Sequence, residues 1–119
     1  MEYLFICYPN CSTCKKAESW LKDQGIEFAK RNIKEDNPSV SELSQWLNMS
    51  ELPIQKFFNT SGKLYRDHDV KTKLTFLSEE ELVDLLASDG MMVKRPILVS
   101  SDKVLVGFKE VFWNQELLK

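Results

Sequence analysis

The first third of the chain alternates short apolar runs with amphipathic segments. The run Tyr3–Cys7 is apolar and ends just before a proline, which is typical of a buried strand. Residues 14–25 repeat apolar positions at helical spacing and end on Gly25, where a C-terminal cap is expected. Residues 27–33 favour a second strand. Strand, helix and strand within about thirty residues match the length of a βαβ unit.

The middle of the chain, from about residue 38 to residue 90, has the pattern of several short helices. Ser39–Glu42 and Ser78–Glu81 are S-x-x-E capping boxes, and each precedes an apolar face at helical spacing. Pro53 opens a further short helix. Residues 65–69, with the sequence YRDHD, are expected to form a polar turn. We therefore expect an inserted helical segment here.

The last quarter of the chain has the pattern of a hairpin followed by a helix. Pro96–Ser100 and Val104–Phe108 are two apolar runs separated by a short polar turn, and residues 109–119 favour a helix. Without the helical middle, the order of elements is that of thioredoxins and glutaredoxins. The sequence therefore predicts one α/β domain over residues 1–119, a thioredoxin/glutaredoxin-like fold with a helical insertion at about 38–90.

Composition narrows the classes of function. The 119 residues suit one domain, and 43% hydrophobic with 29% charged residues is ordinary for a soluble globule. A net charge of −2 is unlike the basic excess of nucleic-acid binders, so no direct nucleic-acid contact is expected. No apolar stretch approaches the roughly 20 residues that span a membrane, and the N-terminus lacks the pattern of a signal peptide. We expect a cytoplasmic protein.

All three cysteines lie close together in the sequence, at Cys7, Cys11 and Cys14. Structural disulfides are rare in the reducing cytoplasm, so the C-x-x-C spacing there indicates transient redox chemistry or a metal site. Tetrahedral zinc would need two more ligands, and Cys7 and His68 are the remaining candidates. Cys7 is better explained as a buried strand residue and His68 as a surface residue. We expect neither a metal nor an organic cofactor.

The position of the pair favours redox chemistry. Cys11 is expected at the start of the first helix and Cys14 one turn later, with Cα atoms roughly 5 Å apart, so a Cys11–Cys14 disulfide can form. Free N–H groups and the helix dipole favour a Cys11 thiolate. Cys11 would be the nucleophile, and Cys14, on the apolar helix face, the resolving thiol. The backbone N–H groups from Ser12 through Thr13 to Cys14 would help to bind an anionic substrate.

A second candidate feature is Arg95, which directly precedes Pro96. In thioredoxin-type folds, the strand that faces the active-site cysteine opens with a cis proline. If Pro96 holds that place, Arg95 approaches Cys11, where it would stabilise a thiolate and bind an oxyanion. Alternatively, Arg95 is a solvated residue beside an ordinary turn.

Four segments together resemble the ArsC/Spx family of thioredoxin-fold proteins, in the family's order. They are CSTCKKAESWL, FFNTSGKLYRD, LLASDGMMVKRPILV and VLVGFKE. The resemblance implies that the cysteine at Cys11 attacks arsenate or a similar substrate. It also implies that the arginine at Arg95 binds the oxyanion and that thioredoxin, glutaredoxin or a low-molecular-weight thiol supplies electrons.

The sequence departs from the glutaredoxin-linked arsenate reductases of the family at several places. Those enzymes carry a histidine where Cys7 stands, and they typically lack a cysteine at the place of Cys14. They also have two further oxyanion-binding arginines, where this chain has Asn59 and Gly107. Arg66 is near enough in sequence to substitute for one of them.

The other branch of the family, Spx, is a redox-sensing regulator that binds the alpha subunit of RNA polymerase. It shares the C-x-x-C pair and the arginine at Arg95, but the loop after LNMSELP lacks the glycine that Spx presents to the polymerase. We predict an arsenate reductase-like thiol oxidoreductase acting on a small oxyanion or disulfide substrate. The alternative is an Spx-like redox regulator that binds RNA polymerase alpha.

Overall fold

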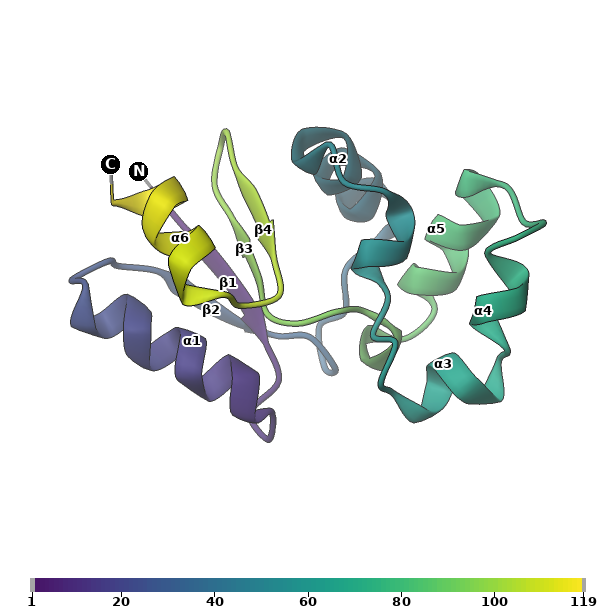
Figure 1. Ribbon diagram of the computed structural model, residues 1–119, viewed down its shortest axis with the longest axis horizontal. Helices are drawn as coiled ribbons and strands as arrows, with labels where there is room; N and C mark the ends of the chain where they lie inside the picture. Colours follow the sequence, from purple (N-terminus) through teal and green to yellow (C-terminus); the bar gives the residue numbers. More distant parts are fainter. Residues whose placement is uncertain (1, 119) are drawn as a thin grey trace. The chain divides into compact units, whose positions relative to one another are not determined.

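The computed structural model describes residues 2–118 and divides the chain into two compact units (Figure 1). One unit combines both ends of the chain, up to Asn32 and from Arg95 onwards. The other is the continuous segment Ile33–Lys94. The helical insertion expected at about 38–90 falls inside this second unit, and the prediction of a single domain stays a prediction.

The first unit is built on a four-stranded mixed sheet with the order β2-β1-β3-β4. Its strands are β1 (Leu4–Cys7), β2 (Ala29–Asn32), β3 (Ile97–Val99) and β4 (Val104–Val106). β1 runs parallel to β2 and antiparallel to β3, and β3 and β4 form the expected antiparallel hairpin. The parallel pair requires a crossover, which the helix between β1 and β2 supplies.

Two helices pack against one face of this sheet, α1 (Ser12–Asp23) and α6 (Glu110–Leu117) (Figure 1). Because side chains alternate along a strand, Phe5 and Cys7 share the face that these helices cover. Trp113 of α6 is fully buried there, and its Nε1 donates a hydrogen bond to the Gly107 carbonyl at 3.0 Å. The aromatic side chains of the first unit therefore form the core beside the thiol segment.

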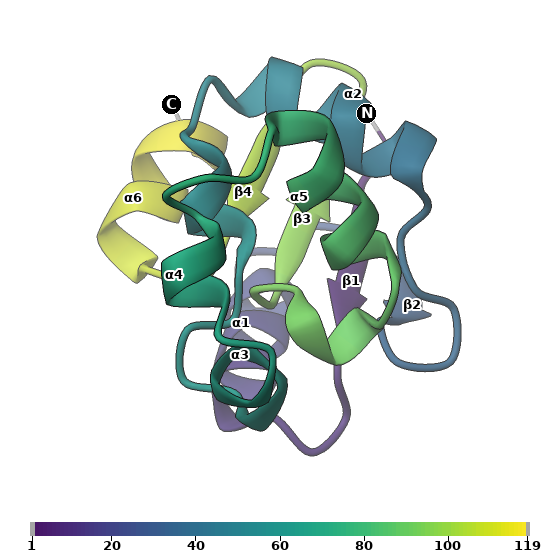
Figure 2. The same ribbon diagram turned by 90° about the vertical axis from the view of Figure 1, so that its right-hand side faces the viewer.

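The second unit consists of short helices (Figure 2). They are α2 (Val40–Ser50), η1 (Ile54–Phe57), α3 (Lys63–Asp67), α4 (Val70–Lys73), α5 (Glu79–Ala87) and η2 (Gly90–Met92). Both capping boxes form as expected, with Ser39 capping α2 and Ser78 capping α5. α2 packs against α5, and the Lys94 N–H donates to the Phe57 carbonyl at 2.7 Å.

The prediction of a polar turn at residues 65–69 was wrong in part. Tyr65–Asp67 belong to α3, and only His68 and Asp69 connect it to α4. Each of these helices is five residues long or shorter. So few residues show no hydrophobic period, which explains why the pattern missed them.

The order of the elements confirms the α/β class and the thioredoxin/glutaredoxin-like arrangement, with the helical insertion between β2 and β3. Within residues 2–118, no helix is both long enough and apolar enough to cross a membrane.

Candidate active site

A tight turn joins β1 to α1 and sets the position of the first cysteine of the pair. The Cys11 N–H donates to the Tyr8 carbonyl at 3.0 Å, and Pro9 occupies the second position of this turn, where proline is favoured. Cys11 has an extended backbone, with φ −96° and ψ 121°, and is the N-cap of α1. The N–H groups of Ser12 and Thr13 therefore point out of the first helical turn without helical acceptors.

Cys14 lies one turn into α1 and is buried, as its place on the apolar face predicted. Its Sγ accepts a hydrogen bond from the Tyr8 N–H at 3.4 Å. Burial raises the pKa of the Cys14 thiol to about 12, and the Tyr8 hydrogen bond opposes this only partly. Cys14 therefore carries its proton at neutral pH.

Cys11 is half-buried, and its thiol is free, as are those of Cys7 and Cys14. Burial by itself would raise the pKa of the Cys11 thiol, but the N–H and thiol of Cys14 and the guanidinium of Arg95 together lower it below its ordinary value. The Cys14 N–H lowers the pKa of Cys11 in this way although the Cys11 side chain does not form the hydrogen bond of a regular N-cap. Of the pair, Cys11 is the more exposed and the more acidic.

Arg95 is placed at this site by the sheet. The Arg95–Pro96 peptide is cis, and β3 begins directly after Pro96. Ile97 pairs with Ile6 of β1, and continuing this antiparallel register by two residues puts Arg95 opposite Tyr8. The Cζ atom of Arg95 lies over the Tyr8 ring, 5.3 Å from its centroid.

Two donors of Arg95 are left without acceptors. Its Nε and Nη1 are buried and have no hydrogen-bond partner among the residues that the structure describes. Buried guanidinium N–H groups are costly to leave unpaired, so such groups commonly mark a place where a ligand or an ion binds. The Arg95 side chain thus brings positive charge and unused donors to the Cys11 sulfur.

The other residues proposed from the sequence have different surroundings. Arg66 lies on α3 in the second unit, and its Nη1 donates to the Ser61 carbonyl at 3.2 Å. A role for Arg66 at the thiols therefore stays a prediction. His68 is exposed. Within residues 2–118, no group of three or more His, Cys, Asp or Glu side chains could hold a metal ion.

Cys7 behaves as a core residue of the first unit. It lies at the end of β1, is 2% exposed and packs in the same apolar cluster as Phe5 and Trp113. Burial raises the pKa of its thiol. These observations agree with the interpretation of Cys7 as strand packing.

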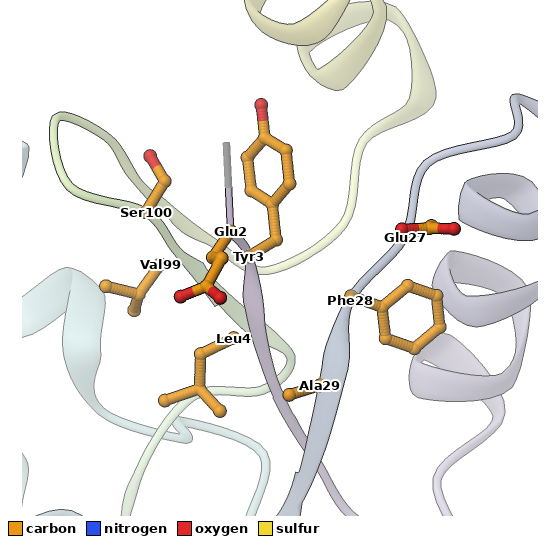
Figure 3. A pocket seen from close by; sticks show the side chains of 8 residues that line it. All are labelled: Glu2, Tyr3, Leu4, Glu27, Phe28, Ala29, Val99 and Ser100. Atoms are coloured by element: carbon orange, nitrogen blue, oxygen red, sulfur yellow. The ribbon is translucent and has the colours of Figure 1, made fainter.

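An open hollow of about 590 Å³ lies elsewhere in the first unit (Figure 3). Its lining side chains come from the starts of β1 and β2 and from the end of β3; among them are Tyr3, Phe28 and Ser100. Since Cys11 follows the other end of β1, this hollow is remote from the thiols. The thiol site is therefore identified by its reactive side chains and not by a cavity.

Sequence reasoning missed Tyr8. Its backbone and its ring contact all three groups of the site, yet a tyrosine before a proline has no pattern that distinguishes it from a packing residue. The signal that could have identified it is the pairing of β1 with β3, which, when extended two residues beyond Ile6 and Ile97, puts Tyr8 opposite Arg95.

The chain is similar to known proteins along most of its length. The model of the ArsC family matches residues 7–115. The uncharacterized protein YusI of Bacillus subtilis is 48% identical over 110 residues, which are 92% of this chain and 93% of the relative. The global transcriptional regulator Spx of Lactiplantibacillus plantarum is 28% identical over 102 residues, which are 86% of this chain and 76% of the regulator.

Solved structures match at similar length. An ArsC-family-related protein from Bacteroides fragilis has a TM-score of 0.93 at 49% identity, covering 97% of both chains. A possible arsenate reductase from Streptococcus mutans has a TM-score of 0.88 at 40% identity, covering 97% of this chain and 98% of that one. The fold is therefore shared along almost the whole chain.

Proposed function

Because the chain belongs to the ArsC family, we propose that it is an arsenate reductase-like thiol oxidoreductase with Cys11 as its nucleophile. The observation that carries this proposal is the contrast within the cysteine pair. The pKa of Cys11 is lowered beside the Arg95 guanidinium, whereas burial keeps Cys14 protonated. A nucleophile and a resolving thiol require this difference.

The substrate proposed for the site is a small oxyanion such as arsenate. The unpaired Nε and Nη1 of Arg95 and the N–H groups at the start of α1 supply donors for its oxygens. They would bind the negative charge while the Cys11 thiolate attacks the central atom. An S–As bond forms, the As–O bond to one hydroxyl group breaks, and that hydroxyl takes up a proton from solvent and leaves as water. A thiolate and an oxyanion repel each other, so the positive charge of Arg95 is needed for this approach.

Cys14 then completes the reduction. Its sulfur attacks the Cys11 sulfur, the S–S bond forms, and the electron pair of the S–As bond stays on arsenic, which leaves as arsenite. The proton of Cys14 passes to an oxygen of the departing group, since the thiol is protonated beforehand. A thioredoxin, a glutaredoxin or a small thiol in the cytoplasm would return the disulfide to two thiols.

The test is turnover of arsenate by the purified, reduced protein. NADPH consumption is followed with thioredoxin and its reductase, and separately with glutathione, glutaredoxin and glutathione reductase. Mass spectrometry after one turnover should show a Cys11–Cys14 disulfide, and Cys14→Ser should stop at the first adduct. If neither system supports turnover, or if Cys14→Ser turns over like the wild type, the proposal is wrong.

A second candidate function is a redox switch of the Spx type. The chain is related to the regulators Spx and MgsR and carries the C-x-x-C pair. In this proposal, the Cys11–Cys14 disulfide would change a surface that binds the alpha subunit of RNA polymerase. Binding of the isolated C-terminal domain of alpha is measured with the reduced and the oxidised protein, and no binding in either state would exclude it.

A further inference from the structure

Tyr8 contacts all three groups of the proposed site. Its carbonyl accepts the Cys11 N–H at 3.0 Å, and its N–H donates to the Cys14 sulfur at 3.4 Å. Its ring lies under Arg95, with 5.3 Å from Cζ to the ring centroid. Any residue with a backbone N–H could make both backbone contacts, but the contact with Arg95 requires an aromatic side chain.

The ring contact explains how the Arg95 side chain can be held in place while its N–H donors stay available for a ligand. A buried arginine is usually fixed by hydrogen bonds to carboxylates or carbonyls, which use up its donors. Here Nε and Nη1 have no partner within residues 2–118. An aromatic ring binds the guanidinium through its electron-rich face, so it restrains the group without accepting from those N–H bonds.

The surroundings of Arg95 also bear on its charge. A carboxylate in place of the ring would hold the guanidinium but would cancel its positive charge and repel an oxyanion. An aromatic ring holds the guanidinium without opposing its positive charge, and that charge lowers the pKa of the Cys11 thiol.

We propose that Tyr8 is a positioning residue for oxyanion binding, whose ring orients Arg95 so that its free N–H groups face an anion bound at Cys11. This inference rests on the proposed function for the identity of the ligand. The placement of Arg95 beside Cys11 does not depend on the proposed function, because Arg95 acts on the Cys11 thiol before any substrate is present.

The test compares Tyr8→Phe, which keeps the ring, with Tyr8→Leu, which removes it. Tyr3→Leu is the matched control, since Tyr3 lines the hollow at the other end of β1. The first measurement is the rate of Cys11 alkylation by iodoacetamide against pH, without substrate. The second is protection of Cys11 from alkylation by inorganic phosphate, an analogue of arsenate that cannot be reduced.

We expect Tyr8→Leu to move the midpoint of the alkylation profile to higher pH and to weaken phosphate protection roughly three- to tenfold, as the loss of a cation–π contact predicts. Tyr8→Phe and Tyr3→Leu should match the wild type in both measurements. If Tyr8→Leu has the wild-type midpoint, or if Tyr8→Phe is as impaired as Tyr8→Leu, the positioning role of the ring is refuted.

A variant that keeps the shape of the ring guards against a folding defect. Trifluorophenylalanine at position 8 fills nearly the same space but weakens the negative face of the ring, so its alkylation midpoint should lie above that of Tyr8→Phe. Equal midpoints would refute the cation–π role. Absence of phosphate protection and of arsenate turnover in the wild type would instead refute the proposed function, and the alkylation midpoints would still decide the role of Tyr8.

Discussion

Cys11 and Cys14 lie within one helical turn, yet the pKa values of their thiols are shifted in opposite directions. The difference comes from their surroundings, because Cys14 is buried against the sheet whereas Cys11 faces Arg95 and the start of α1. Two identical side chains thereby acquire different acidities. The sequence indicated which cysteine would be more exposed, since Cys14 shares the apolar helix face with Ala17 and Leu21.

At the residue scale, we predict that Arg95→Gln raises the pKa of Cys11. Its guanidinium lowers that pKa through hydrogen bonding and charge, so its loss should shift the midpoint of Cys11 alkylation to higher pH. The matched control is Lys94→Gln, which removes a charge one residue earlier in the chain. Equal midpoints for Arg95→Gln and wild type would contradict the assignment of Arg95 to the thiol.

A second prediction concerns the stability of the reduced protein in alkali. The pKa of Cys14 is raised to about 12 in the folded state, so the folded state holds this proton more tightly than the unfolded state does. Stability is therefore full below the pKa of an unfolded thiol, about 8.5, and declines as the pH rises towards 12. The slope contributed by one such proton approaches about 1.4 kcal/mol per pH unit.

The measurement is urea unfolding of the reduced protein at several pH values between about 7 and about 10.5, well above the ordinary thiol pKa. Cys14→Ala removes this thiol and its effect on the pKa of Cys11, and it keeps all the other titrating side chains. Its free energy of unfolding should fall less steeply with pH than that of the wild type. Parallel slopes for the two proteins would show that Cys14 is not the group responsible.

At the element scale, the helices of the second unit start where their capping boxes form. Ser39 accepts from the Glu42 N–H at 3.1 Å, and the Glu42 carboxylate accepts from the Ser39 N–H at 3.0 Å. Ser39→Ala should lower the free energy of unfolding by about 1 kcal/mol, the usual cost of a lost N-cap. Ser44→Ala, in the exposed middle of α2, is the control and should leave stability unchanged or slightly higher. Thermal or urea unfolding measures the stability of both variants. An equal loss of unfolding free energy in the two would refute the capping role of Ser39.

At the scale of the whole molecule, the second unit brings its two ends together at Gly90. A Cβ atom built on Gly90 would lie 1.7 Å from the carbonyl oxygen of Ile33, so a side chain there would force the backbone apart. Gly90→Ala should cost more than about 3 kcal/mol, because the neighbour is backbone and cannot turn away.

The matched control is Gly25→Ala, since Gly25 has φ +69° and a Cβ atom added there would meet no other atom within 4 Å. Its cost should be only about 1–2 kcal/mol, from the left-handed backbone alone. The stabilities of the two variants are compared by urea unfolding, with soluble yield as a second measure. A Gly90→Ala protein as stable as Gly25→Ala would contradict the close approach to Ile33.

The fold was predictable from the sequence where local patterns are strong. The prediction failed where the helices are short. The strand before the cysteines, the long helix α1 and both capping boxes carry periodic or capping signals that depend only on neighbouring residues. The helices α3 and α4 carry none, since each is about one turn long. Their existence depends on packing, which the sequence pattern does not contain.

The sequence by itself determined the pair of cysteines at a helix start, because C-x-x-C spacing and an N-terminal cap are local features. Only the tertiary structure decided which distant groups act on that pair. Arg95 and Tyr8 are far apart in the chain, and the pairing of β1 with β3 ends just before them and brings the guanidinium of Arg95 over the Tyr8 ring. Strand pairing depends on the assembly of the whole sheet, so Arg95 comes next to Cys11 only when the chain has folded.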